Sequence, residues 1–464
     1  MPSYTRLSTL AKAKHADHSP RPIDTIPTEL LMIIFEEYCE TARSADEPLC
    51  LPELLLTQVC RYWKSIAVGL PSLWTKLAIT SVIPFTIVST YLERAQHLPL
   101  DLEVDLQCDG FNSTERQQLL DTWKLVHSHS SQWRSLIIQL GPDDAKTVLD
   151  SLCDLNAPLV KELEVTCTTH LPETTPLFNG GLPSLTSLRL AGISLHRFTT
   201  LLPQITQLHL TSNNPIPFPI FQGLMNTMVK LQDLTLRKRV VEGWPLYPLA
   251  EDTIQLPSLQ SLKVSDRRCP VFVPLLSISA PVMKTLTLYD LTAHDLPQSF
   301  QEAKICDNFP SISNLTLKGK SSFVDNGSFN QLSRVFPTID HFSLLGVDEE
   351  FVRESSRAMH ATSVWPKLQT ISMIPVVEED MLYSLISART QPVAKSALKT
   401  VLVPIDTQLE NLGSISQQLD DADSMLSPIF SFHDSSSRRC SIDLTAGGGF
   451  IFDRDSSSLS RLQM

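Results

Sequence analysis

Residues 183–190 read Pro-Ser-Leu-Thr-Ser-Leu-Arg-Leu, and this short pattern decides the fold. Its end, Leu188-Arg189-Leu190, alternates apolar and polar residues, which is the period of a β-strand with one buried face. Proline has no N–H to give to a strand ladder, so Pro183 belongs at the entry to the strand. The segment therefore predicts a short strand whose leucines face a core.

The same pattern recurs along the chain at intervals of about 20 to 31 residues. Copies that start with proline begin at residues 158, 203, 257, 281, 310, 337 and 366, and copies without it occupy 231–236 and 398–403. Residues 133–138 are interpreted as the first copy. One unit buries too little apolar surface to fold alone, so neighbouring units must stack into a continuous solenoid. The alternative is a plain α/β domain whose buried strands happen to be rich in leucine.

The repeats resemble leucine-rich repeats over residues 131–405. The family's Asn or Cys, which turns the chain after each strand, has a counterpart only at Asn213. The resemblance therefore implies an irregular leucine-rich-repeat-like solenoid with uneven turns.

A second signal lies near the N-terminus, where residues 26–35 read Ile-Pro-Thr-Glu-Leu-Leu-Met-Ile-Ile-Phe. Proline costs no hydrogen bond in a first helical turn, and Glu29 suits the positive end of the helix dipole. Four apolar residues then follow one helical stripe, at Leu30, Ile33, Ile34 and Tyr38. Leu31 and Phe35 form a second stripe beside it. One stripe can face the chain's own second helix and the other needs a partner, unless the domain buries the helix on all sides.

The N-terminal segments resemble the F-box motif over residues 24–78. The matching segments are Ile26–Leu31, Ile34-Phe35, Val59–Trp63 and Leu70–Trp74, with Ile26 where the family usually has Leu and a longer stretch at Arg43–Leu51. The Val-Cys-Arg-x-Trp and Leu-Pro-x-Leu-Trp signatures are similar to those of F-box-like proteins of mushroom-forming fungi. The resemblance implies docking on the Skp adaptor of a cullin–RING ubiquitin ligase. The implied contact residues are Ile26, Pro27, Leu30, Leu31, Ile34, Phe35, Val59, Trp63 and Trp74, with Trp63 and Trp74 equally compatible with an internal core.

Composition narrows the classes of function. The chain has 464 residues and a net charge of −12, which disfavours nucleic-acid binding, and no apolar run is long enough to span a bilayer. With no secretory signal, nine cysteines and no Cys-x-x-Cys pair, a cytoplasmic or nuclear location with reduced thiols is expected. No catalytic, metal-binding or cofactor-binding motif is present, so no enzyme activity, metal or cofactor is predicted.

The predicted organisation has six parts. They are a flexible leader (1–23), an F-box-like helical domain (24–78), a linker and N-terminal cap (79–130), the solenoid (131–405), a C-terminal cap (406–434) and a Ser/Gly-rich tail (435–464). Together they indicate an α/β chain in which a short helical F-box precedes the solenoid.

Two functions fit this organisation. The first is a substrate receptor of an SCF-type ubiquitin ligase, whose repeats bind an unidentified target protein. The alternative is a non-degradative F-box and leucine-rich-repeat scaffold. Exposed strand positions such as Arg189, His209, Lys263 and Thr287 are varied polar residues with no common charge or aromatic theme, so no target-binding residues are predicted.

Overall fold

The computed structural model of the chain describes sixteen stretches of residues. They are 26–44, 51–80, 82–107, 113–168, 175–212, 215–265, 271–291, 299–319, 326–347, 349–360, 364–374, 384–385, 388–389, 398–404, 429–433 and 439–443. The predicted leader at 1–23 lies outside them. Over the described ranges, no helix combines the length and apolar character needed to cross a bilayer.

Helices open the chain and then alternate with strands. The α-helices are α1 (Thr28–Ser44), α2 (Pro52–Val59), α3 (Arg61–Val68), α4 (Phe85–Ala95), α5 (Ser113–His127), α6 (Ala145–Leu152), α7 (Phe218–Met225), α8 (Val273–Ser277), α9 (Ser299–Asn308), α10 (Asn326–Val335) and α11 (Glu349–His360). Short 3-10 helices are η2 (Pro71–Trp74), η3 (Ser130–Gln132), η4 (Leu195–Phe198) and η5 (Leu202–Gln204).

Fifteen strands form one sheet in nearly sequential order. In spatial order they are β1 (Lys76–Ile79), β2 (Leu100–Leu106), β3 (Trp133–Leu140), β4 (Glu162–Cys167), β5 (Ser187–Ala191), β6 (Gln207–Ser212), β8 (Asp233–Lys238), β11 (Ser261–Ser265), β13 (Thr285–Tyr289), β14 (Asn314–Lys318), β15 (His341–Leu345), β16 (Thr370–Ile374), β17 (Thr400–Pro404), β19 (Arg439–Asp443) and β18 (Ile429–His433). Two further pairs are β7 (Ile216–Pro217) with β9 (Val241–Glu242), and β10 (Ile254–Gln255) with β12 (Ile278–Ser279).

The predicted repeats are confirmed as parallel strands in register. Leu188 of β5 pairs with Leu208 of β6, which pairs with Leu234 of β8, and each of these leucines is buried. The pattern continues through β11, β13, β14 and β15, so every repeat adds one apolar layer to a continuous core. A mixed α/β chain with a long parallel sheet, consistent with a leucine-rich-repeat-like solenoid, is therefore the observed fold.

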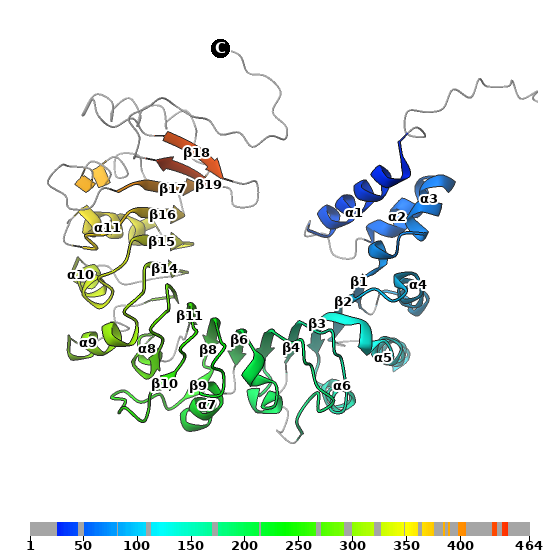
Figure 1. The fold of residues 1–464 in the computed structure, drawn as a ribbon, viewed down its shortest axis with the longest axis horizontal. Coiled ribbons are helices and arrows are strands. Elements are labelled where there is room, and N and C mark those ends of the chain that lie inside the picture. The colour runs from blue at the N-terminus through cyan, green and yellow to red at the C-terminus, as the bar shows by residue number, and fades with distance from the viewer. Residues whose placement is uncertain are drawn as a thin grey trace, which may run out of the picture.

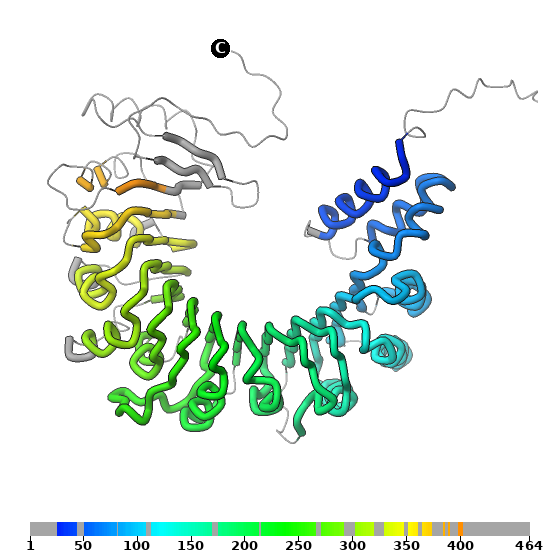
Figure 2. Tube along the Cα trace, viewed as in Figure 1, coloured from blue at the N-terminus to red at the C-terminus, as the bar shows by residue number. Residues whose placement is uncertain are grey.

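The sheet curves into an open arc. Figure 1 shows the strands along the inner side of the arc and helices α4 to α11 along the outer side, with α1–α3 at one end and β17–β19 at the other. Neighbouring strands lie about 4.8 Å apart, whereas neighbouring packed helices lie about 10 Å apart. The layer that contains the helices is therefore longer than the layer of strands, so the sheet curves with its strands on the inner side. The tube in Figure 2 follows the same arc through each turn of the chain. Buried leucines point outward to the helices, and the alternate residues face the hollow of the arc.

Two predicted boundaries need correction. The sheet begins with β1 and β2, so residues 76–79 at the end of the predicted F-box-like domain and residues 100–106 of the predicted cap are strands of the same sheet as the repeats. The sequence signal was present, because residues 71–79 carry the repeat pattern with one extra residue before the strand. At the other end, Arg439–Asp443 of the predicted tail forms β19, which pairs antiparallel with β17 and β18.

Candidate partner-binding site on the N-terminal helices

Helix α1 begins where the sequence predicts it. Pro27 lies immediately before the helix, and its carbonyl accepts hydrogen bonds from the N–H groups of Leu30 and Leu31, both at 3.1 Å. Glu29 lies in the first turn, near the positive end of the helix dipole, and Arg43 lies in the last turn, near its negative end. Both charges therefore stabilise the helix. Across the domain, the hydroxyls of Thr28 and Tyr62 lie 3.0 Å apart, which ties the start of α1 to α3.

One apolar line of α1 faces inward. Leu31, Phe35 and Cys39 occupy successive i, i+4 positions and are almost fully buried. The ring of Phe35 lies 4.9 Å from that of Trp63 on α3, centroid to centroid. Trp74 at the end of η2 is fully buried, and its indole N–H donates to the carbonyl of Ala67 at 2.9 Å. These residues are the core of the helical domain.

A second apolar line of α1 faces outward. Leu30, Ile34 and Tyr38 are 52%, 48% and 42% exposed, and Ile33 beside them is 61% exposed. The exposed apolar side chains of the neighbouring helices are Leu55 and Val59 on α2 and Tyr62 on α3.

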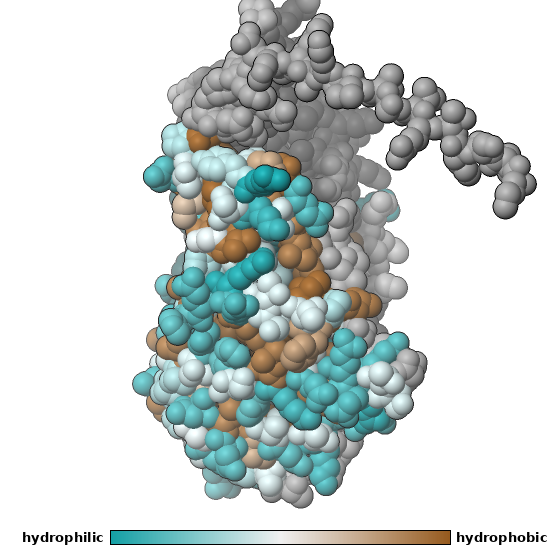
Figure 3. Space-filling model, turned by 90° about the vertical axis from the view of Figure 1, so that its right-hand side faces the viewer, coloured by the Kyte–Doolittle hydropathy of each residue, from teal (hydrophilic) through white to brown (hydrophobic). Residues whose placement is uncertain are grey.

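These outward side chains are concentrated on a small part of the chain. Of the 17 large hydrophobic residues that are exposed in the described part of the chain, seven lie on α1–α3. Those helices have 17, 8 and 8 residues. Figure 3 views the molecule from this side and shows brown, hydrophobic residues between teal ones. We call Leu30, Ile33, Ile34, Tyr38, Leu55, Val59 and Tyr62 the outer apolar face. Exposed apolar residues gathered on neighbouring helices are typical of a surface that binds a partner.

The nine predicted contact residues fall into three groups. Pro27, Leu30, Ile34 and Val59 are exposed, and Ile26 and Trp63 are partly buried against the core. Leu31, Phe35 and Trp74 are at most 1% exposed, so their assignment as contact residues is corrected to a supporting role. The sequence interpretation overlooked Leu55 and Tyr62, although the i, i+4 spacing of Leu55 and Val59 is an apolar signal of its own.

A buried ion pair holds the helical domain on the solenoid. The guanidinium of Arg43 at the end of α1 pairs with the carboxylate of Glu53 on α2, which is 1% exposed. Arg43 also donates to the carbonyl of Leu73 at 3.2 Å, and the Tyr91 hydroxyl on α4 donates to Glu53 at 2.7 Å. The pair therefore connects α1, α2, η2 and α4, and breaking it would leave an uncompensated buried charge.

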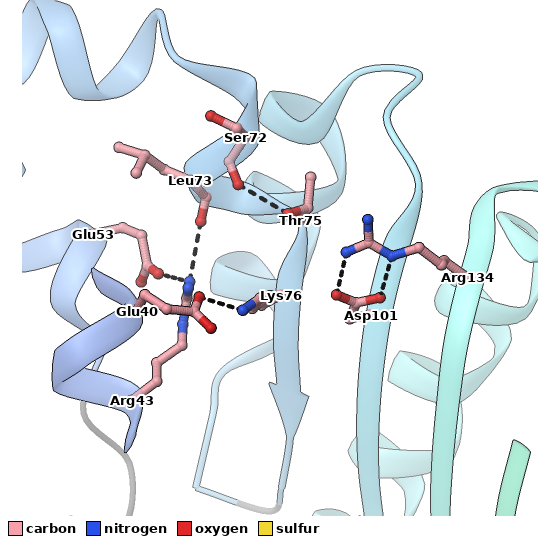
Figure 4. Close-up of polar contacts among 9 residues, drawn as sticks. All are labelled: Glu40, Arg43, Glu53, Ser72, Leu73, Thr75, Lys76, Asp101 and Arg134. Atoms are coloured by element: carbon pink, nitrogen blue, oxygen red, sulfur yellow. Dashed lines mark hydrogen bonds and ion pairs between the residues drawn. The ribbon is translucent and has the colours of Figure 1, made fainter. Parts of the chain in front are cut away.

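More polar contacts extend this connection to the first strands (Figure 4). Lys76 of β1 pairs with Glu40 of α1, and the hydrogen bond from Lys76 lowers the pKa of that carboxyl. Asp101 of β2 accepts two hydrogen bonds from the guanidinium of Arg134 of β3, at 2.8 and 2.5 Å. We call these contacts, together with the Arg43–Glu53 pair, the polar junction. Within it, the contacts of Arg43 with Leu73 and of Lys76 with Glu40 link α1 to η2 and to the first strand of the sheet.

Within the described ranges, no three His, Cys, Asp or Glu side chains come together as metal ligands would. A hollow of about 450 Å³ lies beside the polar junction, lined among others by Asp101, Glu103 and Asp105.

The sequence matches no protein-family model and no curated protein. Among solved structures, the chain is similar to a crystal structure of a TLR13–ssRNA13 complex, with 13% sequence identity and a TM-score of 0.25. The match covers 73% of this chain, and the chain spans 56% of the length of that one. The fold assignment therefore rests on the strand register described above.

Proposed function

We propose that the chain is a substrate receptor of an SCF-type ubiquitin ligase, with α1–α3 as an F-box that docks on the Skp adaptor. The observation that carries the proposal is the outer apolar face. It combines with the F-box-like pattern of residues 24–78, which places apolar residues at these helical positions. The solenoid then presents its concave surface to a target protein.

In this proposal the chain makes and breaks no covalent bond. It binds the adaptor at one end and the target along the arc, which raises the concentration of the target near a ubiquitin-charged enzyme held elsewhere in the complex. The polar junction supports this role, because contacts between the helices and the sheet restrict the angle between the two binding surfaces and so keep the target within a smaller region of space. A flexible connection would spread the target over a larger volume and lower its effective concentration.

The test is binding of purified Skp adaptor to the full chain and to the double variant Leu30→Asp/Ile34→Asp. Both side chains are about half exposed, so the variant should fold. Burying two carboxylates in an apolar interface costs several kcal/mol, so we expect affinity to fall at least about 100-fold.

A matched control is Val229→Asp/Val282→Asp, which changes two exposed apolar residues of the solenoid that are 52% and 45% exposed. It carries the same added charge and should bind the adaptor like the unaltered chain. Absence of adaptor binding by the unaltered chain would reject the proposal. Equal weakening of both variants would show that net charge, not the outer apolar face, controls binding.

A further inference from the structure

The concave face carries a charge pattern that the linear sequence hides. Register places Glu103, Ile137 and Glu164 side by side on β2, β3 and β4. The same row continues as Arg189 on β5, His209 on β6, Thr235 on β8 and Lys263 on β11. The sign of the charge therefore changes once along the row, between β4 and β5. At that point Arg189 and Glu164 form an ion pair at 3.5 Å.

Two further cations extend the positive part of the face. The guanidinium of Arg237 on β8 lies 5.3 Å from the centroid of the Tyr289 ring, and the Lys318 ammonium on β14 lies 5.7 Å from it. Both cations are exposed, and the ring of Tyr289 is half-buried. Cation–π interactions with this ring keep both charges on the concave face. Arg237 and Lys318 lie two residues further along their strands than the row through Arg189, His209 and Lys263. We call these five residues together the basic row.

The positive charges of the basic row lie close enough to repel one another. Burial lowers the pKa of His209, and the charges of Arg237, Arg189 and Lys263 lower it further, so all three cations act on one imidazole. Asp233 is the one carboxylate at the inward positions of β5, β6, β8, β11, β13 and β14. Although the whole chain has a net charge of −12, several of its cations lie close together on this face and repel one another. An anionic ligand would relieve that repulsion on binding.

We propose that the basic row binds an acidic polypeptide segment of the target protein. The row crosses six neighbouring strands, which at about 4.8 Å per strand spans roughly 24 Å. An extended peptide of about seven residues covers that length. The acidic strands β2 and β4 repel a longer polyanion, and this favours a short acidic segment over a nucleic acid. This inference names the target class of the receptor proposed above.

The test is fluorescence anisotropy with the full chain and a labelled eight-residue peptide that has four glutamates alternating with serines. We expect saturable binding that weakens as sodium chloride rises, because exposed charge pairs are screened. The same peptide with glutamine in place of glutamate should not bind. Both peptides are measured without the Skp adaptor, so failure here leaves the adaptor proposal standing.

The variant Arg237→Gln/Lys263→Gln removes two charges of the basic row and should weaken binding about tenfold. The control Lys230→Gln/Arg334→Gln removes two exposed charges from the turn before β8 and from α10, so it should bind the peptide normally. Failure of the glutamate peptide to bind, or equal weakening by both double variants, would overturn the inference. Tighter binding of a labelled single-stranded RNA at physiological salt would overturn it in favour of a nucleic-acid ligand.

Discussion

Replacing Arg43 with methionine should loosen the helical domain while leaving the solenoid intact. Methionine keeps most of the apolar stem but removes the cation that compensates Glu53, whose side chain is 1% exposed. Loss of one partner of a buried pair costs about 3–5 kcal/mol. Arg43 is itself 24% exposed and the Tyr91 hydroxyl still donates to Glu53, so we expect a smaller loss than this, of about 2–3 kcal/mol.

Native-state hydrogen exchange measures this effect locally. A loss of 2–3 kcal/mol raises opening, and therefore exchange, of the α1–α3 amides about 30- to 150-fold. Amides of β11 and β13 serve as the internal reference and should not change. Adding Glu53→Gln to Arg43→Met removes the stranded charge and should restore part of the protection. Unchanged exchange in α1–α3, or faster exchange in the double variant, would refute the reasoning.

Three further predictions concern other parts of the chain. Phe35→Ala should cost about 3–5 kcal/mol of stability in thermal denaturation, because its ring is buried, whereas Leu30→Ala should stay within about 0.5 kcal/mol. The pKa of His209, followed by NMR, should lie below the ordinary value of a histidine side chain, and Arg237→Gln should raise it by removing a repulsive charge. Because the unfolded state then takes up the proton first as pH falls, His209 should reduce stability below about pH 6.5, and Arg237→Gln should lessen that loss. Finally, Arg389→Met should expose α11 and β16 to exchange, because the buried guanidinium donates to the carbonyls at 359, 364 and 365.

The repeating strands and the amphipathic N-terminal helix can be predicted from the sequence. Both follow from local patterns: a two-residue period after a proline predicts each strand, and apolar stripes at helical spacing predict α1. The pattern also predicted that α1 has more apolar surface than its own domain buries. The pattern did not show which of the two stripes is buried, because Leu30 and Leu31 are equally apolar. The packing of α2 and α3 against α1 buries the stripe of Leu31 and leaves the stripe of Leu30 exposed.

Tertiary structure alone decided which side chains share the concave face. The sequence places Arg189, His209 and Lys263 at exposed strand positions, but it does not show which strands are neighbours. Parallel stacking in register places all three in the same row of the sheet. The uncharged Thr235 of β8 lies between His209 and Lys263 in that row. Electrostatic interaction depends on distance in space, so the basic row exists only once the strands have stacked.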